Sequence, residues 1–345
     1  MKINNRLINV ENPPYVIAEM SANHNGDISN AYKIIDMAKT AGADAVKLQT
    51  YKPDTITMDM HTPEFMIEGG LWDGQSLYEL YESAFMPWEW HKPLFEYAQK
   101  IGITIFSSPF DNTAVDLLED LNAPAYKIAS FEAVDLPLIK YVAQTGKPMI
   151  ISTGMADSEE ILEAIEAAKE GGCKELAILH CVSGYPAPAE DYNLRTLVDM
   201  QQRFGLVTGL SDHTIDNTTA ISSVALGVSI IEKHVTLDRN GGGPDDSFSL
   251  EEEGLKKLCV GVKTAWQSLG KVDYGMKSSE QGSVKFRRSI YAVKDIKKGE
   301  QLTKENVKSI RPGFGLAPKY YEQILGKTAK FDIRRGTPLS FNLVL

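Results

Sequence analysis

Two histidines stand at matching places in this sequence, each at the end of a short apolar run. His213 follows VTGLSD (207–212), and His234 lies near the end of IIEKHV (230–235). Neighbouring strands lie about 4.8 Å apart, so two imidazoles that point inward from adjacent strands can bind one ion. A lone buried histidine is more often a hydrogen-bonded core residue, but a matched pair favours metal binding. The sequence therefore predicts a metal site at His213 and His234.

The residue types favour an open metal site over a closed structural one. Only these two histidines converge, and the three cysteines, Cys173, Cys181 and Cys259, are scattered without the spacing of metal ligands. A closed zinc site usually takes four such ligands. We expect a divalent cation that keeps room for water or a substrate oxygen, with Mn²⁺ first and Mg²⁺ or Co²⁺ as alternatives.

Two lysines, Lys47 and Lys127, face inward by the two-residue alternation of a strand. A buried lysine is costly unless an anion pairs with it, so a structural ion pair competes with an anionic ligand. Gly154 lets backbone N–H groups approach a ligand closely. Small hydroxyl side chains end the neighbouring runs: Ser108, Ser130, Ser152, Thr153 and Ser211. Together these residues predict a pocket for phosphate and carboxylate groups.

A Schiff-base aldolase is the competing use of an inward lysine in a barrel. That chemistry needs one lysine with a lowered pKa and no metal. Here two lysines and a candidate metal pair occur together, which disfavours it.

Carboxylates near the run ends are candidates for binding hydroxyl groups or moving protons. Glu19 belongs to the first run and Glu132 follows the fourth; for both, an ion pair with Lys47 or Lys127 is the alternative. Asp245 lies in GGGPDDS after the last run, where a solvated turn residue is equally expected.

The elements that must position these residues are eight apolar runs, each followed by a segment with helical periodicity. Strand followed by helix, repeated eight times, predicts an α/β fold of the (β/α)8 TIM-barrel type. A doubly wound open sheet is the alternative, but it would favour a Gly-rich loop, and the chain has no GxGxxG. The runs are YVIAEM (15–20), AVKLQT (45–50), TIFSSP (104–109), AYKIAS (125–130), PMIIST (148–153), AILHCV (177–182), VTGLSD (207–212) and IIEKHV (230–235).

A long insertion, residues 51–86, follows the second run, whereas the other connections are compact. In a TIM barrel this loop lies on the face that carries active sites, and long ordered loops there are usually lids or specificity elements. We expect it to select the substrate.

The chain divides into a barrel domain of residues 1–270, a linker of residues 271–286 rich in Gly, Ser and Lys, and a small domain of residues 287–345. The segments DIKKGEQLT and DIRRGTPLS of the small domain are near repeats of one turn pattern, which indicates an internal duplication.

Composition narrows the classes of partner. A net charge of −10 argues against binding nucleic acid, because such binding depends on clustered Lys and Arg. No apolar run approaches the roughly 18 residues that cross a bilayer, and the start lacks the apolar core of a signal peptide. With scattered cysteines, this predicts a cytoplasmic protein that binds neither membrane nor nucleic acid.

The motifs IAEMSANHNG, VKLQTY, FSSPF, AYKIASFE, ISTGM, SDHT and EKH, in this order, resemble the sialic acid synthase family. These transferases join phosphoenolpyruvate to an N-acetylamino sugar and make nine-carbon 2-keto sugar acids. The segment from about residue 287 resembles their antifreeze-like (SAF, β-clip type) domain. The resemblance implies a metal-assisted attack of phosphoenolpyruvate on an aldehyde, with addition of water and loss of phosphate by C–O cleavage.

The resemblance also implies roles for single residues. His213 and His234 match the metal ligands, and Glu132 matches a carboxylate that helps water to add, with Lys47, Lys127 and Glu19 as further catalytic candidates. The positions that match the phosphoenolpyruvate pocket are Lys47, Ser108, Lys127, Ser130, Ser152, Ser183 and Ser211. Those that match the sugar site are Glu19, Gln49, Trp72, Tyr185, Asp245 and Arg311.

Arg311 lies in the small domain, in SIRPGFG. In the family, the matching arginine reaches the sugar across a domain-swapped homodimer; its alternative here is a surface cation. An ice-binding role for the small domain is disfavoured, because the segment carries KKGE and RRG rather than a flat array of short side chains.

Departures from the N-acetylneuraminate branch concern the sugar. Ser183 replaces an Asn, Phe131 precedes Glu132 where that branch has Gly, and Leu71 and Trp72 stand where a polar contact is expected. Apolar contacts suit a sugar with a methyl group at C6, because a buried donor without its hydroxyl partner is penalised. GGLWD, LYELYES and SFEA resemble the branch that acts on 2,4-diacetamido-2,4,6-trideoxy-L-altrose. The legionaminate and N-acetylneuraminate branches are the alternatives.

Overall fold

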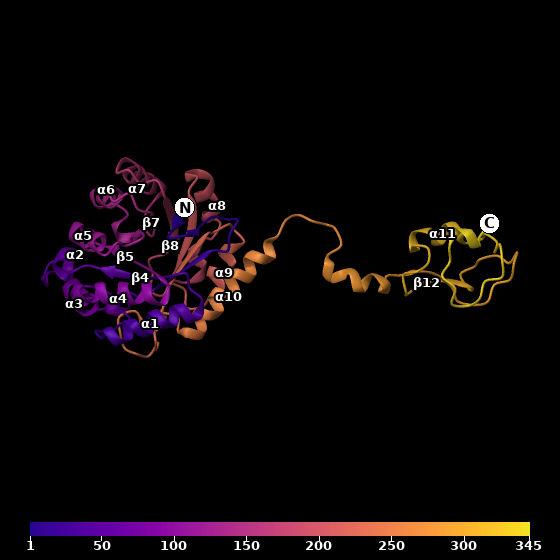
Figure 1. The fold of residues 1–345 in the computed structure, drawn as a ribbon, viewed down its shortest axis with the longest axis horizontal. Coiled ribbons are helices and arrows are strands. Elements are labelled where there is room, and N and C mark those ends of the chain that lie inside the picture. The colour runs from indigo at the N-terminus through magenta and orange to yellow at the C-terminus, as the bar shows by residue number, and fades with distance from the viewer. The chain divides into compact units, whose positions relative to one another are not determined.

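The computed structural model describes all 345 residues and divides them into two compact units, Met1–Gly270 and Lys271–Leu345. Figure 1 shows the first unit as strands ringed by helices and the second as a smaller body of short elements. Each unit is described by itself.

The first unit is a closed barrel of parallel strands in the order β10-β3-β4-β5-β6-β7-β8-β9, which confirms the predicted (β/α)8 fold. All eight predicted runs form its strands. Their bounds are β3 Tyr15–Glu19, β4 Ala45–Thr50, β5 Thr104–Pro109, β6 Tyr126–Ile128, β7 Met149–Ser152, β8 Leu176–Cys181, β9 Val207–Asp212 and β10 Ile230–His234.

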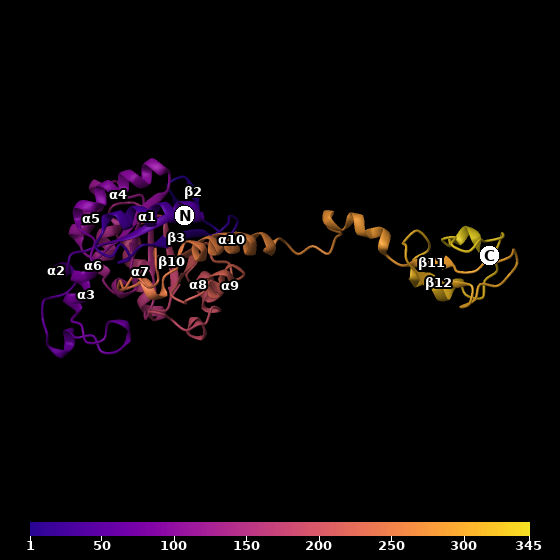
Figure 2. The same ribbon diagram turned by 90° about the horizontal axis from the view of Figure 1, so that it is seen from below.

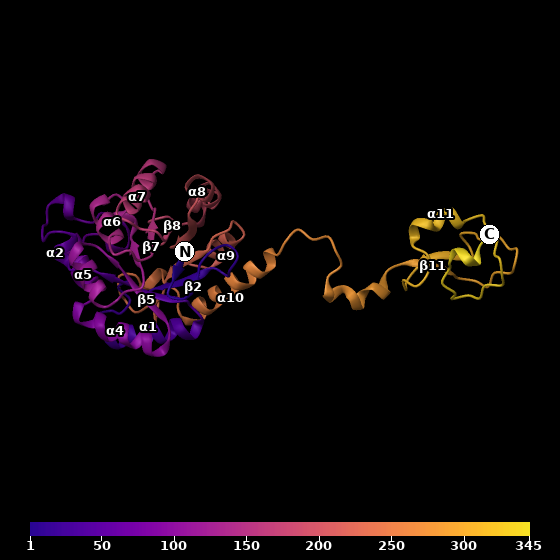
Figure 3. The same ribbon diagram turned by 45° about the horizontal axis from the view of Figure 1, so that its top comes forward.

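Helices lie around this barrel, as Figure 3 shows for most of them. They are α1 Ile28–Ala41, α4 Trp88–Ile101, α5 Asn112–Asp120, α6 Leu136–Ala143, α7 Ser158–Glu170, α8 Thr196–Phe204, α9 Thr218–Val224 and α10 Glu252–Leu269. Local signals set their ends. In α1, the Asp27 side chain accepts from the N–H of Ser29, and Gly42 ends the helix with a left-handed φ of 93°.

Strand alternation separates two apolar cores. Outward side chains such as Val16 and Val46 pack against the helices, while inward ones such as Ile17 and Phe106 fill the barrel. A hairpin of β1 Lys2–Ile3 and β2 Arg6–Leu7 adds Ile3 to the inner core. Because apolar side chains fill the amino-terminal part of the barrel, the inward polar side chains gather at the carboxyl ends of the strands.

The insertion between β4 and α4 is ordered and folds into α2 Pro53–Ile56, two 3-10 turns (Pro63–Phe65 and Gly70–Trp72) and α3 Leu77–Ala84. Figure 2 shows α2, α3 and their connection at one side of the barrel unit. Ser76 begins α3 with a capping box to Glu79, which fixes the point where the chain re-enters a helix.

The second unit has its own apolar core, which includes Ile290, Leu302 and Leu339. It contains a 3-10 helix Ser278–Phe286, the antiparallel strands β11 Ser289–Ala292 and β12 Val307–Ile310, and α11 Tyr321–Ile324. The predicted linker, residues 271–286, is exposed and includes that 3-10 helix. No helix in either unit is both long and apolar enough to span a membrane.

The two repeated turns of the second unit contact each other reciprocally. Asp332 accepts from the N–H of Lys298 at 2.9 Å, and Asp295 accepts from the N–H of Arg335 at 2.7 Å. The repeat seen in the sequence is therefore a structural repeat.

Candidate active site

Strand register brings the polar side chains together at the carboxyl ends of the barrel strands. His234 pairs with Glu19 and Glu19 with Lys47, while Glu232 pairs with Ser211. These strands are far apart in the sequence, and barrel closure between β10 and β3 makes their ends neighbours.

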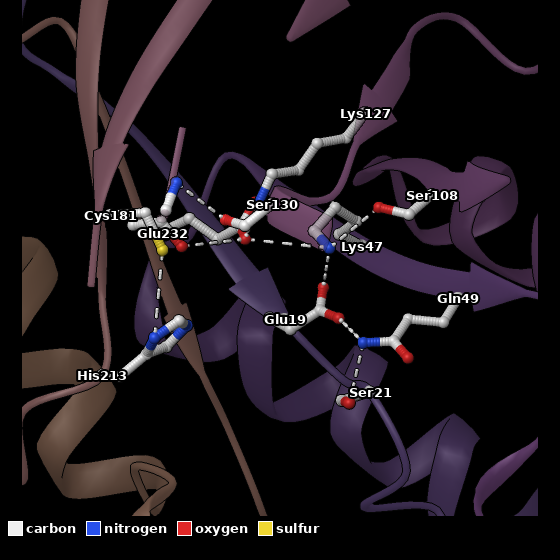
Figure 4. A network of polar contacts seen from close by, with 12 residues as sticks. Glu19, Ser21, Lys47, Gln49, Ser108, Lys127, Ser130, Cys181, His213 and Glu232 are labelled. Carbon is white, nitrogen blue, oxygen red and sulfur yellow. Dashed lines mark hydrogen bonds and ion pairs between the residues drawn. The ribbon is translucent and has the colours of Figure 1, made fainter. Parts of the chain in front are cut away.

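A buried network of charges forms the floor of the site (Figure 4). Lys47 Nζ lies 2.7 Å from Glu19 Oε2 and 3.7 Å from Glu232 Oε1, and it donates to Ser108 Oγ at 3.2 Å. Lys127 donates to the same oxygen of Glu232. All four charged side chains are at most 4% exposed. Each ammonium group thus has a carboxylate partner, so the ion-pair alternative holds in this structure, and any anionic ligand must compete with Glu232.

Burial and charge act in opposite directions on the carboxyls of this network. Burial raises the pKa of Glu19 above its ordinary value, although Lys47 opposes the shift. Burial alone would also raise the pKa of Glu232, but the ammonium groups of Lys127 and Lys47 lower it. Glu232 therefore stays ionised between the two lysines, as its position requires.

The predicted hydroxyls surround this floor. Ser130 Oγ accepts from the N–H of Gly154 at 3.2 Å, and Ser211 Oγ lies 3.5 Å from Glu232 Oε1. Ser152 Oγ is buried and has no hydrogen-bond partner. A buried hydroxyl without a partner is costly, so Ser152 is an available donor for a ligand.

Gly154 is required by its neighbours. A Cβ at this position would lie 2.3 Å from Ser183 Oγ and 2.8 Å from Ser130 Oγ. Only glycine lets these two hydroxyls meet the backbone here, which places Ser183 with the other predicted serines.

The two imidazoles lie side by side, with ring centroids 5.3 Å apart. His213 Nδ1 lies 2.7 Å from the carbonyl oxygen of Val182 and must donate to it, which leaves Nε2 as the ring nitrogen with a free lone pair. His234 Nδ1 is buried, has no hydrogen-bond partner and lies 3.6 Å from Asp245 Oδ2. Two adjacent imidazoles with ring nitrogens that no protein group uses fit a divalent cation. No group of three or more His, Cys, Asp and Glu side chains is arranged to enclose an ion.

Three of the predicted sugar contacts, Glu19, Gln49 and Asp245, are joined by hydrogen bonds through Ser21. Gln49 Nε2 donates to Glu19 Oε1 and to Ser21 Oγ, both at 2.9 Å, and Ser21 Oγ donates to Asp245 Oδ2 at 2.5 Å. Asp245 is only 8% exposed, so the solvated-turn alternative is wrong. Tyr185 stacks on His213 with ring centroids 4.4 Å apart.

Above this floor lies a cavity of about 370 Å³. Its polar lining includes Gln49, Ser130, Glu132, Ser183, Tyr185, His234 and Asp245. The insertion supplies an apolar wall, formed by Ile56, Ile67, Trp72, Leu77, Leu80 and Ala84. Residues 51–86 thus form part of the pocket, and their role in selecting the substrate stays a prediction.

Within this wall, Leu71 and Trp72 differ. Trp72 lines the cavity, and its indole N–H donates to the carbonyl of Pro244 at 3.1 Å. Leu71 is 47% exposed and does not line the cavity. The interpretation of Leu71 as a sugar contact is wrong, because the 3-10 turn Gly70–Trp72 directs neighbouring side chains differently.

Glu132 is a cavity carboxyl without a cationic partner. Its Oε2 is buried and makes no hydrogen bond, and burial raises the pKa of Glu132 to about 7. The ion-pair alternative is therefore not observed for Glu132, and a carboxyl with this pKa can both give and take a proton near neutral pH.

Arg311 is exposed on the second unit, and its contact with a sugar stays a prediction. The other predicted site residues either line the cavity or are buried inside the barrel unit. Sequence reasoning left Glu232, Ser21 and Cys181 out of the site. Glu232 had a usable signal, since it shares the inward parity of His234 in IIEKH. Cys181 Sγ lies 4.0 Å from His213 Nδ1.

The chain matches known sequences over both units. The profile described as the NeuB family matches residues 34–274, and the SAF domain profile matches residues 287–345. The pseudaminic acid synthase of Campylobacter jejuni is 45% identical over 98% of this chain and 98% of its own length. The N,N'-diacetyllegionaminic acid synthase of the same strain is 38% identical over 91% of this chain and 95% of its own.

Solved structures agree with this match. The N-acetylneuraminic acid synthetase of Leptospira borgpetersenii superposes with a TM-score of 0.73 at 30% identity, covering 83% of this chain and 95% of the other. The similarity thus extends from the motifs to the fold that carries them.

Proposed function

This chain belongs to the NeuB family, the sialic acid synthases, and from that premise we propose that it makes pseudaminic acid. The reaction joins C3 of phosphoenolpyruvate to the aldehyde carbon of 2,4-diacetamido-2,4,6-trideoxy-L-altrose. Water adds at C2, and the C–O bond to phosphate breaks, which releases inorganic phosphate. The observation that carries the choice of product is the 45% identity over 98% of both chains with a pseudaminic acid synthase.

The charged floor suits phosphoenolpyruvate. Lys47 and Lys127 supply two fixed positive charges, and Ser108, Ser130, Ser152, Ser183 and Ser211 supply hydroxyl donors around them. In the absence of ligand, Glu232 holds the lysines in place. The phosphate and carboxylate groups of the substrate then bind to ammonium groups that are already oriented, so little entropy is lost on binding.

The cavity above suits a deoxy amino sugar. Gln49, Asp245 and Tyr185 offer polar groups on one side, with Glu19 behind Gln49. The apolar wall of the insertion faces them, and Ile67 and Trp72 are placed to contact a methyl group at C6. A hydroxylated C6 would leave its hydroxyl without a partner against this wall, which penalises N-acetylmannosamine, the sugar of the N-acetylneuraminate branch.

His213 and His234 would hold a divalent cation, Mn²⁺ first among the candidates. When bound, such a cation polarises the aldehyde carbonyl of the sugar as a Lewis acid. Glu132 acts on the water that adds at C2, because its pKa of about 7 lets it accept the proton at working pH. The aromatic ring of Tyr185 covers one side of His213.

The active unit is a homodimer in which Arg311 of one chain contacts the sugar bound by the other. The support is the SAF domain at residues 287–345, together with the matched position of the arginine. A cytoplasmic location is supported by three free cysteines, because disulfides are rare in reducing compartments.

Phosphate release from phosphoenolpyruvate with Mn²⁺ tests this function. The purified chain would receive the altrose derivative, its legionaminate-pathway counterpart or N-acetylmannosamine. Release with the altrose sugar alone supports the proposal. Preferred turnover of the legionaminate-pathway sugar would favour the second candidate, whose synthase is 38% identical. No release with any sugar would overturn the assigned reaction.

A further inference from the structure

Directly behind the two histidines, on the outer face of the same strands, lies a second buried ion pair. Lys233 on β10 and Asp212 on β9 are register partners, and Lys233 Nζ lies 2.8 Å from Asp212 Oδ2. Asp212 is 0% exposed and Lys233 2%. Each is one residue away from a histidine of the site, so strand alternation places the ion pair outside the barrel wall and the imidazoles inside.

The ammonium group of Lys233 also reaches past His213. It donates to the carbonyl oxygen of Thr214 at 2.5 Å and lies 3.3 Å from Thr214 Oγ1. Asp212 Oδ1 in turn accepts from the N–H of Thr214 at 2.9 Å. Both chain neighbours of His213 are therefore bound to the residue that precedes His234.

Tyr192 holds the same backbone from another direction. Its hydroxyl accepts from the N–H of His213 at 2.7 Å and donates to the carbonyl of Ser211 at 3.2 Å. Tyr192 is 0% exposed and belongs to the 3-10 helix Ala189–Tyr192, in the loop after β8. Side chains from two separate segments thus fix the backbone at His213.

We propose that Lys233, Asp212 and Tyr192 are positioning residues that set the distance and orientation between His213 and His234 for the cation. The inference rests on the proposed metal site and concerns residues that touch neither cation nor substrate. An ion pair with a purely structural role could lie anywhere in the core. Here every contact of the ion pair falls on a residue next to an imidazole, and Tyr192 accepts from the N–H of His213 itself. At these positions small backbone shifts would change the geometry of the two ligands.

The test measures binding of Mn²⁺ to metal-free protein by electron paramagnetic resonance, independently of turnover. Tyr192→Phe removes the hydroxyl and keeps the ring, and Lys233→Met removes the ammonium group. Both should weaken Mn²⁺ binding by about 10-fold or more, the usual effect of losing a group that orients metal ligands. Tyr141→Phe is the matched control, because its hydroxyl donates to Asp116 at 2.7 Å on the helices and should leave binding unchanged.

Lys233→Met leaves Asp212 charged in a dry site and can prevent folding. The double variant Asp212→Asn/Lys233→Met removes both charges, and Tyr192→Phe tests the same inference without a change of charge. Thermal unfolding establishes that each variant is folded before binding is compared.

The outcomes separate this inference from the function on which it rests. If His213→Ala binds Mn²⁺ as tightly as the unaltered chain, the metal site itself is wrong and the inference falls with it. If binding depends on His213 but is unchanged in folded Tyr192→Phe and in the double variant, the metal site stands and the positioning role is overturned. Weaker binding in these variants, with Tyr141→Phe unaffected, supports it.

Discussion

Lys127 on β6 and Glu232 on β10 form an ion pair across the interior of the barrel, although 105 residues separate them in the chain. The same carboxylate lies 3.7 Å from Lys47. One acidic side chain therefore keeps two buried ammonium groups together, at the place where we propose that phosphoenolpyruvate binds.

Replacing Lys127 should weaken binding of phosphoenolpyruvate. We expect Lys127→Met to raise the KM for phosphoenolpyruvate by about 10- to 100-fold, because hydrogen bonds to charged groups contribute about 1.5–3 kcal/mol. Steady-state kinetics with the sugar saturating measures this. Lys147→Met is the control, since Lys147 pairs with Glu119 at 2.7 Å and is 25% exposed. An unchanged KM in a folded Lys127→Met variant would make this lysine structural.

Glu132 should give both stability and turnover a dependence on pH. Its pKa is raised from 4.5 to about 7, so the folded state holds a proton that the unfolded chain loses first. The contribution of Glu132 to the free energy of unfolding is complete below pH 4.5 and is lost as the pH rises through 7. The free energy of unfolding changes by about 3 kcal/mol between these limits. Glu132→Gln should make the free energy of unfolding less dependent on pH between pH 5 and 8. Urea titrations at several pH values measure this.

In kinetics, Glu132→Gln should lower kcat by about 100-fold and remove the inflection near pH 7, as expected for loss of a general acid or base. A variant that keeps the inflection would assign the proton transfer to another group.

Loss of either imidazole should abolish turnover while the fold remains. We expect His213→Ala and His234→Ala each to lower activity by about 100-fold or more. Loss of a group that only orients a metal ligand lowers activity by up to about 100-fold, and loss of the ligand itself should cost at least as much. Circular dichroism tests the fold, and dialysis against a chelator should inactivate the unaltered chain reversibly. Metal-dependent turnover in either variant would remove the metal assignment.

The apolar wall of the insertion should select against a hydroxylated C6. We expect Ile67→Ser to narrow the preference for the 6-deoxy sugar over N-acetylmannosamine by about 10-fold, since apolar pocket contacts are worth about 1–3 kcal/mol. The ratio of kcat/KM values for the two sugars measures this. Leu71→Ser, at 47% exposure and outside the cavity, is the matched control and should keep the ratio. If Ile67→Ser and Leu71→Ser had the same ratio of kcat/KM values, the apolar wall would not determine which sugar is preferred.

Arg311 should act on the other chain of a dimer. Arg311→Ala should raise the KM for the sugar, and mixing it with inactive His234→Ala should restore part of the activity, because a mixed dimer then has one complete site. Turnover of the mixture against that of each variant alone measures the recovery. Mixed dimers without recovered activity would contradict the domain-swapped arrangement.

Much of this site was determined by sequence alone, because strand alternation is a local property. Eight apolar runs predicted eight barrel strands. The two-residue alternation along AVKLQT, AYKIAS and IIEKHV predicted that Lys47, Lys127 and His234 point inward. The hydroxyls at the run ends lie around the same floor for the same reason.

Only the tertiary structure decided which charges meet. From the sequence, Glu19 and Glu132 were the candidate partners of the two lysines. Barrel closure and strand register instead pair Lys127 with Glu232 and leave Glu132 without a cation. The insertion has no strand alternation to count, so the packing of its turns decided that Trp72 lines the cavity and Leu71 does not. Alternation fixes the face of a side chain locally, whereas its partner depends on contacts between strands that lie far apart in the chain.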